Sequence, residues 1–249
     1  MLIIQLSDSH LKADPAGVYR DVEVEARLIS MLAVVAGYQP DLIVVSGDVS
    51  DDGSLASYQR AAGHLDALGC RWVWLPGNHD HPATMAEVRA LEPIIHLAGW
   101  QILLLNSWVE GEEGGRLGRQ QLAHLDAQLA GEASPALLVL HHPPVSVEAD
   151  WMNEIGLEDR EAFWAGPGRS DHLQAVLCGH IHHEMTCLHQ GVPVMSVPAI
   201  AAQFVPESQE FAVDSHAPGG FRLIHLGVDD AGQPRLSTRV EYVPVQQPG

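Results

Sequence analysis

The sequence predicts an α/β protein, because two patterns of apolar residues follow one another along its 249 residues. Before residue 180, short apolar runs that suit buried strands alternate with segments whose apolar residues recur at helical spacing. After residue 180 the helical segments stop, and Gly and Pro punctuate short apolar runs. This second pattern predicts antiparallel strands, either as a second sheet or as a mixed extension of the first. Alternating strand and helix is typical of an α/β fold.

Six apolar runs in the first part of the chain predict buried strands. Four more segments after residue 180 predict the later strands, and their sequences are EMTCLH, VPVMSVP, FRLIHLGV and STRVEYVPV. The six early strands are predicted at residues 2–6, 41–46, 71–75, 100–105, 136–140 and 173–178.

Four helices are predicted between the early strands. Apolar residues recur at helical spacing over 20–37 and again over 54–68. Ser54 precedes the second of these segments, and serine is a residue type that caps helices. Pro82 can begin a third helix, since proline suits the first helical position, and residues 119–130 predict a fourth.

Composition limits the cellular setting and the partners. Lys and Arg number 13 against 32 Asp and Glu, a formal charge of −19, which would repel a nucleic acid polymer. No apolar run approaches the roughly 18 residues of a membrane span, and the opening residues MLIIQLSDSH show neither the basic region nor the cleavage site expected of a signal peptide. We therefore expect a cytoplasmic protein with reduced cysteines and no membrane partner. Without linkers or repeats, we expect one domain over 1–245 and a frayed tail over 246–249.

Five of the predicted strands end in groups that bind metal ions. In open α/β sheets the ligand crevice lies outside the carboxyl ends of the strands, so these five loops are expected to converge on one site. The groups are Asp8-Ser9-His10, Gly47-Asp48, Gly77-Asn78-His79-Asp80, His141-His142 and Gly179-His180-Ile181-His182.

The spacing of these groups strengthens the prediction. Extended residues i and i+2 point to the same side of the chain, so Asp8 with His10, and His180 with His182, can each present two ligands together. Glycines before Asp48 and other motif residues permit sharp turns. A set of histidines, aspartates and an asparagine amide without cysteine suits borderline or hard first-row cations.

The number of potential ligands predicts two metal ions, because one ion rarely takes seven such groups. Two divalent ions, offset by two aspartates and a bridging hydroxide, would leave a local charge of about +1 that attracts phosphate. Asn78 is expected to bind one metal through its amide oxygen. His79 is expected to face the substrate, where it would steady a phosphoryl oxygen or protonate the leaving alkoxide. Asp80 is expected to hold the imidazole of His79 by accepting a ring N–H.

Taken in order, the motifs D-x-H, GD, GNHD, HHPP and GHIH resemble those of the calcineurin-like metallophosphoesterases. This resemblance spans residues 2 to about 243. It implies a four-layer αββα sandwich of two mixed β-sheets flanked by helices, and metal-assisted hydrolysis of phosphate esters. The stretches GDVSDDGSLASYQ, WVWLPGNHD, VLCGHIHHE and FAVDSHAPGGFRL are similar to bacterial 3′,5′-cyclic-AMP phosphodiesterases of the class III type.

The resemblance also implies a division of the ligands between two iron or manganese ions, with zinc as an alternative. His142 remains an alternative to His141 as a ligand. The substrate phosphate is expected to touch Asn78, His79, His10 and His182. One metal would be held by Asp8, His10 and His182, the other by Asn78, His141 and His180, with Asp48 bridging.

The sequence therefore predicts a phosphodiesterase that hydrolyses a cyclic nucleotide, 3′,5′-cyclic AMP before others, by attack of metal-bound hydroxide on phosphorus. Alternatives are a broader phosphodiesterase acting on glycerophosphodiesters or 2′,3′-cyclic nucleotides, a nuclease, and a nucleotide-binding sensor without turnover. Residues 146–172, which include Trp151, Met152, Ile155 and Trp164, are expected to form the wall that selects the leaving alcohol. The protein is expected to be a monomer or a homodimer.

Overall fold

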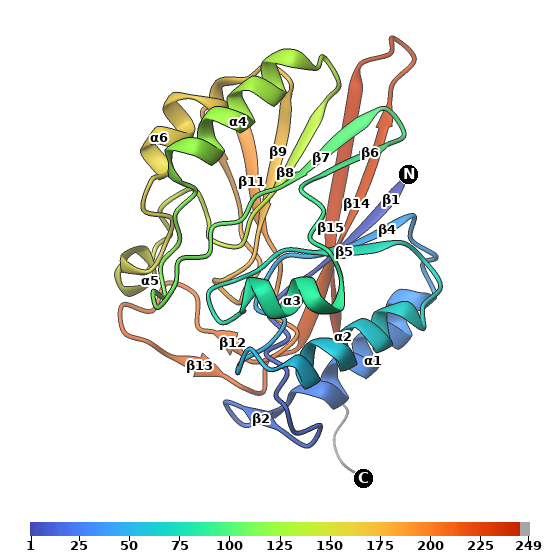
Figure 1. The fold of residues 1–249 in the computed structure, drawn as a ribbon, viewed down its shortest axis with the longest axis vertical. Helices are drawn as coiled ribbons and strands as arrows, with labels where there is room; N and C mark the ends of the chain where they lie inside the picture. Colours follow the sequence, from blue (N-terminus) through green and yellow to red (C-terminus); the bar gives the residue numbers. More distant parts are fainter. Residues whose placement is uncertain (245–249) are drawn as a thin grey trace.

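Two mixed β-sheets pack against each other in the computed structural model, which describes residues 1–244 (Figure 1). The first sheet has the order β15 (Pro234–Val243), β14 (Gly219–Val228), β1 (Leu2–Leu6), β4 (Leu42–Val45) and β5 (Trp72–Trp74). The second has the order β10 (Thr186–His189), β11 (Val192–Ser196), β9 (Leu173–Cys178), β8 (Ala136–Val139), β7 (Trp100–Leu104) and β6 (Ile94–Leu97).

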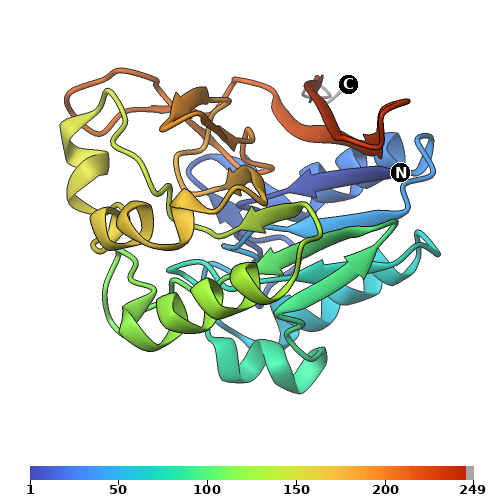
Figure 2. The same cartoon turned by 90° about the horizontal axis from the view of Figure 1, so that it is seen from above.

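Helices cover the outer face of each sheet, as the view from above makes plain (Figure 2). The longer helices are α1 (Val24–Ala36) and α2 (Leu55–Asp66) on the first sheet and α4 (Gly118–Gly131) on the second. Shorter ones are α3 (Pro82–Val88), α5 (Asp150–Glu154), α6 (Arg160–Ala165) and a 3₁₀ turn at Pro167–Arg169. The predicted four-layer αββα sandwich is therefore confirmed.

Alternation along the strands explains why each apolar run is nearly continuous. Ile3 packs between the sheets, whereas its neighbour Ile4 packs under the helices of the first sheet. Leu137 and Leu138 divide in the same way in the second sheet. A strand covered on both faces needs apolar residues at every position. Within residues 1–244 no helix combines the length and hydropathy that crossing a bilayer demands.

The six early strands are confirmed to within one residue at each end, and the four predicted helices are present. The first helix starts later than expected, because β2 (Val18–Tyr19) and β3 (Val22–Glu23) form a hairpin before it. The prediction missed β6, α5 and α6. The tail expected at 246–249 lies outside the described residues, and a single domain over 1–245 stays a prediction.

The later strands divide between the two sheets, which the sequence left open. β14 and β15 extend the first sheet in antiparallel pairing, as expected. The prediction was wrong for β11, which pairs parallel to β9, while β10 pairs antiparallel to β11 at the edge. Strand pairing depends on distant partners, so a local pattern of apolar residues does not reveal it. β12 (Gln203–Phe204) and β13 (Val213–Asp214) form a separate two-stranded ribbon before β14.

A buried polar contact holds the ends of three strands together beneath the site. The side chain of Gln5 in β1 donates from Nε2 to the hydroxyl of Ser46 after β4, at 2.9 Å, and to the carbonyl of Cys178 in β9, also at 2.9 Å. The Nε2 of this buried amide thus links residues of both sheets at their carboxyl edge. The loops that follow these strands therefore begin side by side.

Candidate metal centre

The loops after five strands bring the predicted ligands together. Two clusters of His and Asp each have potential ligand atoms within 4.8 Å of one another. Asn78 follows β5 and lies beside the second cluster, with its Oδ1 3.1 Å from His141 Nε2. The clusters are Asp8, His10, Asp48 and His182, and His141, His142 and His180.

Atoms that carry lone pairs face one another in the first cluster. The Nδ1–H of His182 donates to the carbonyl of Ala202 at 2.7 Å, an arrangement that in the neutral imidazole makes Nε2 the acceptor. This Nε2 lies 3.1 Å from Nε2 of His10 and 3.3 Å from Oδ1 of Asp8. Buried acceptors that face each other are unfavourable unless something positive lies between them. The donor set therefore fits a cation.

The same arrangement recurs in the second cluster. His141 donates from Nδ1 to the carbonyl of Ser46 at 2.8 Å, which aims Nε2 at Asp48 Oδ2, 3.3 Å away. Nε2 of His180 is buried without a hydrogen-bond partner. Asp48 therefore stands between the clusters, where a bridging ligand would have to be.

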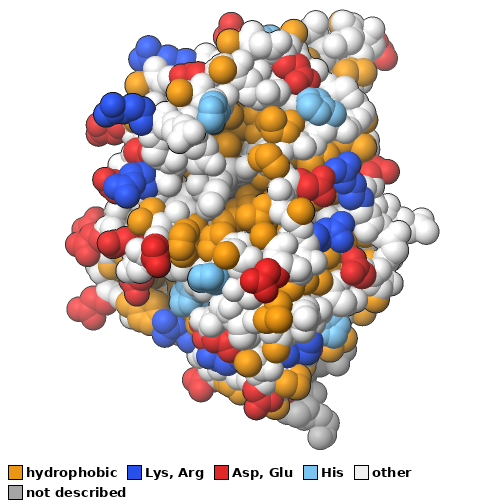
Figure 3. Space-filling view, viewed as in Figure 1, with side chains coloured by type: hydrophobic (Ala, Val, Ile, Leu, Met, Phe, Trp, Pro, Cys, Tyr) orange, Lys and Arg blue, Asp and Glu red, His pale blue; other side chains and the backbone are white. Residues whose placement is uncertain are grey.

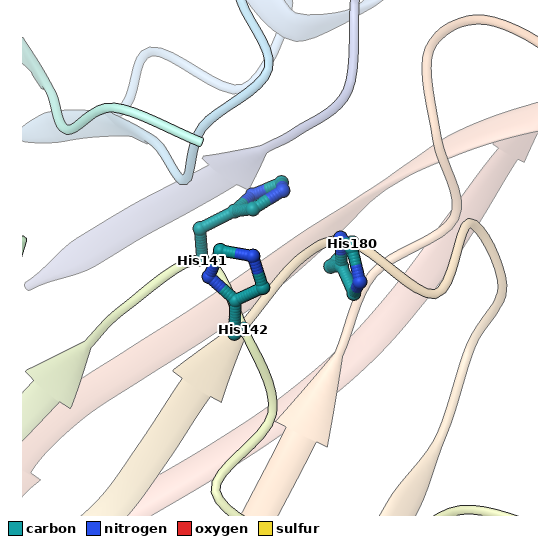
Figure 4. A group of neighbouring side chains, drawn as sticks. All are labelled: His141, His142 and His180. Carbon is teal, nitrogen blue, oxygen red and sulfur yellow. The ribbon is translucent and has the colours of Figure 1, made fainter. Parts of the chain in front are cut away.

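His141 and His142 differ in where their rings point (Figure 4). His141 reaches from the end of β8 toward the first sheet, whereas the ring of His142 stays over the second. Both ring nitrogens of His142 already have partners, the hydroxyl of Ser107 at 2.8 Å and the carbonyl of Glu113 at 3.1 Å. This favours His141 as the ligand and His142 as a support of the loop.

The two histidines should respond differently to truncation. His141→Ala should remove a potential ligand and lower metal content and turnover together. His142→Ala should leave metal content near normal and lower the melting temperature, since it deletes two hydrogen bonds of a buried ring, worth about 1 kcal/mol each. Metal analysis by mass spectrometry and thermal unfolding would measure both. Equal metal content in the two variants would contradict the assignment.

Five of the seven predicted ligands have left-handed backbone conformations. Their φ angles are 57° for Asp8, 47° for His10, 48° for Asp48, 70° for His180 and 52° for His182. Positive φ is uncommon outside glycine, although Asp, Asn and His adopt it more readily than other residues. The spacing argument assumed extended pairs i and i+2, and this part was wrong. The side chains converge because tight turns, rather than extended strands, present them.

The glycines before three motifs are required by close approach of neighbouring groups. A Cβ on Gly77 would lie 2.2 Å from Oδ1 of Asp48, and one on Gly179 would lie 2.2 Å from the Ser7 hydroxyl. Gly47 combines φ of 103° with a Cβ position 2.3 Å from Nδ1 of His141. The predicted sharp turns are present, since Asp80 N–H donates to the carbonyl of Gly77 and Ile181 N–H to that of Gly179. A positive φ is required at Gly47 alone of the three, and at the other two the missing side chain makes room for the site.

Asp80 does not orient His79, so that prediction was wrong. The carboxylate of Asp80 turns inward and accepts from the backbone of Val49, Ser50 and Gly77 at 2.9–3.1 Å. The hydroxyl of Tyr58 donates to the same carboxylate at 3.0 Å. Asp80 therefore ties the loops after β4 and β5 together, and all of its oxygens are occupied with that task.

Asp51 is the carboxylate beside His79. Its Oδ1 lies 3.3 Å from Nδ1 of His79 and 3.5 Å from Nδ1 of His10, and Lys12 forms an ion pair with its other oxygen. One carboxylate thus faces a predicted ligand and the predicted catalytic histidine. Asp51 lies three residues after Asp48 in the stretch GDVSD, and that proximity was the available signal in the sequence.

The charges of the cluster shift its pKa values strongly. Burial raises the pKa of Asp48, but His141 and His10 outweigh burial and hold it well below its usual range. Burial lowers the pKa of His141, yet the negative charge of Asp48 raises it to about 9. Carboxylates that draw a proton to His141 would equally attract a cation, which competes with that proton for Nε2.

A cleft of about 380 Å³ opens above the clusters. Asp48, Asn78, His180 and His182 lie on its floor with His79, and its walls carry Tyr19, Arg20, Glu113, Trp151, Glu154, Ile155, Phe204 and Phe211. The wall predicted from residues 146–172 is therefore only partly present. Met152 is buried, and Trp164 packs under the outer face of the second sheet, away from the cleft.

Residues 1–184 match the protein family described as calcineurin-like phosphoesterase, and this chain belongs to that family. It is therefore a metallophosphoesterase, as the order of the motifs indicated.

Curated relatives refine the comparison. The chain is 37% identical over 231 residues to 3′,5′-cyclic adenosine monophosphate phosphodiesterase CpdA of Vibrio vulnificus, covering 87% of this chain and 82% of the relative. It is 34% identical to the protein of the same name from Pseudomonas aeruginosa, covering 98% and 90%. A dimetal phosphatase from Danio rerio has the same fold, with a TM-score of 0.69 at 15% identity over 90% of this chain and 92% of that one.

Proposed function

We propose that this protein is a dinuclear phosphodiesterase that hydrolyses 3′,5′-cyclic AMP to AMP. The observation that carries the proposal is the convergence of buried ring nitrogens and carboxylates beneath a cleft. The relatives that span most of the chain are named for the same substrate. The cleft suits a small ligand, because Glu113 and Glu154 on its walls would repel a polymer of phosphates.

The metal ions are assigned to the residues that face one another. Iron or manganese is proposed from the resemblance to the metallophosphoesterases, with zinc as an alternative, since imidazole and oxygen donors without cysteine suit zinc as well. When bound, the ions would activate water at neutral pH and offset the negative charge that develops on the phosphoryl oxygens. Asp8, His10 and His182 would hold one ion, Asn78, His141 and His180 the other, and Asp48 would hold both.

His79 is the group assigned to the leaving oxygen. Its backbone N–H donates to Asp48 Oδ1 at 2.9 Å, which anchors the residue to the centre. Because Nδ1 faces Asp51, Nε2 is left for the substrate. The imidazole would donate its proton to the ribose oxygen as the bond to phosphorus breaks. Asn78 lies on the floor of the cleft, where the substrate phosphate would touch it.

A substrate panel tests the proposal. Protein loaded with manganese or iron would be incubated with 3′,5′-cyclic AMP, 2′,3′-cyclic AMP, a glycerophosphodiester and single-stranded DNA, and the products separated by chromatography. The highest kcat/KM is expected for 3′,5′-cyclic AMP, with AMP as product. A higher value for another member of the panel would replace the substrate. No product from any of them would favour a nucleotide sensor over an enzyme.

We also propose a cytoplasmic location. Cys70, Cys178 and Cys187 are all unpaired in the structure, and free thiols are typical of a reducing compartment. The three cysteines should react with a thiol reagent after unfolding of protein from a fresh lysate. Fewer than three reactive thiols would argue against the proposal.

A further inference from the structure

Two hairpins from different parts of the chain meet at the mouth of the cleft. β2 and β3 lie beside the ribbon of β12 and β13 at one end of the molecule (Figure 1). Arg20, at the turn of the first hairpin, places its guanidinium carbon 4.5 Å from the ring centroid of Phe211 and 5.2 Å from that of Tyr19. The contact between Arg20 and Phe211 therefore joins the β2–β3 hairpin to the segment between β12 and β13 at the mouth of the cleft.

Phe211 is held firmly although it is exposed. Its ring packs edge-on against Trp151 at 5.2 Å and Phe204 at 5.3 Å between centroids. Trp151 is itself fixed, because its indole N–H donates to the carbonyl of Ser208 at 3.0 Å. Even so, Phe211 remains 45% exposed. Trp151 and Phe204 make T-shaped contacts with its ring, and the guanidinium of Arg20 lies over the ring.

An aromatic wall joins this ring to the candidate metal ligands. Tyr19 stacks on His10 with centroids 4.1 Å apart and planes 8° apart, and Phe204 stacks on His182 at 4.0 Å and 3°. Phe211 follows Phe204 toward solvent. A ligand whose phosphate lies over the cluster would therefore extend its remaining atoms toward Phe211.

We propose that Phe211 and Arg20 recognise the base of a nucleotide whose phosphate lies over the metal centre. The base inserts between the phenyl ring and the guanidinium, so that one of its faces stacks on each. This inference rests on the proposed function and specifies how its site distinguishes nucleotides from other phosphodiesters. Flat π-systems stack on aromatic rings and on guanidinium planes, and such contacts tolerate different bases.

Arg20 has the freedom that insertion requires. Two stacked layers need about 7 Å between the outer planes, so the guanidinium has to withdraw by roughly 2.5 Å from its present position over Phe211, taking about 3.5 Å for each contact. The side chain is exposed, and the turn that carries it consists only of Arg20 and Asp21. Among the residues that line the cleft, Arg20 is the one with a fixed positive charge. The guanidinium now covers the place that a base would take.

Binding measurements on the manganese-loaded protein test the inference independently of turnover. AMP and ribose 5-phosphate share the phosphate and the sugar, and they differ in the base. Phe211→Ala should raise the Kd for AMP by about 5- to 150-fold, the range observed for a base stacked on an aromatic ring, and leave the Kd for ribose 5-phosphate unchanged. Phe211→Leu should resemble Phe211→Ala, because it restores bulk without a π face.

Arg20→Lys separates stacking from charge, since lysine keeps the charge and loses the plane. It should weaken AMP about 2- to 5-fold, the effect of one exposed cation–π contact, and spare ribose 5-phosphate. Tyr242→Ala and Arg235→Ala, on the exposed strand β15, are matched controls that should change neither Kd.

The outcomes separate the two proposals. Unchanged AMP binding in Phe211→Ala, or equal losses for both ligands, would overturn the base slot whether or not the enzyme hydrolyses cyclic AMP. Selective loss of AMP binding supports the slot. If that selective loss is found in a protein that leaves cyclic AMP intact, the slot stands and the proposed substrate fails.

Discussion

Asp48→Ala should abolish hydrolysis even of bis(p-nitrophenyl) phosphate, an activated substrate that needs no help for its leaving group. Oδ2 of Asp48 lies 3.3 Å from His141 Nε2 and 3.6 Å from His10 Nε2, so its loss affects both clusters. Loss of an outer partner of a metal ligand costs about 10- to 100-fold, and loss of a shared ligand should exceed that range. Initial rates and metal content would be measured on the same samples.

Two further variants make this result interpretable. Asp48→Asn keeps the shape of the side chain and an oxygen for the backbone N–H of His79, so it should fold and still lose metal. Asp171→Ala removes an exposed carboxylate elsewhere and should behave like the unaltered protein. Near-normal turnover by Asp48→Ala would defeat the dinuclear mechanism.

His79→Ala should lower kcat for cyclic AMP by about 10²- to 10⁴-fold, the usual contribution of a general acid, and leave metal content near normal. The ring lies 4.8 Å from that of His10 but faces Asp51, and its side chain is 35% exposed in the cleft. The loss should be smaller for bis(p-nitrophenyl) phosphate, since nitrophenolate leaves without protonation. Steady-state kinetics on both substrates would show the difference.

Controls distinguish a catalytic effect from a structural one. His124→Ala, at an exposed position on α4, should change neither rate nor metal content. Asp51→Asn should reduce kcat less than His79→Ala, because the imidazole remains and only its orientation weakens. Release of both ions from His79→Ala would show that the residue is a ligand rather than the acid.

The patterns in the sequence were sufficient for the α/β class and for the residues that gather at the centre, and the resemblance carried by the motifs implied the αββα sandwich. Each predicted ligand directly follows an apolar run, and the carboxyl ends of parallel strands share an edge, so local order predicts a common location. The pairing of β11 with β9 was not accessible in this way. β10 lies between β9 and β11 in the sequence and pairs antiparallel with β11, whereas β9 pairs parallel with β11 on its other side. Nothing in VPVMSVP distinguishes a parallel from an antiparallel neighbour.

The partner of His79 shows a second limit of reading from the sequence. Asp80 adjoins His79 along the chain, but the turn from Gly77 to Asp80 directs that carboxylate to three backbone N–H groups and Tyr58. Asp51 belongs to another loop and reaches His79 through space. Proximity in sequence therefore suggested the right chemistry and the wrong residue, because only the fold determines which loops touch.

The left-handed turns at Asp8, His10, Asp48, His180 and His182 have a consequence for protein engineering. A library selected for heat resistance without added metal would favour glycine or asparagine at these positions, since both relax such turns. The selected variants would have a higher melting temperature and no phosphodiesterase activity, because they would lack the candidate metal ligands. Improvement of this scaffold should therefore hold these five codons constant and screen in the presence of manganese, so that robustness and turnover are selected together.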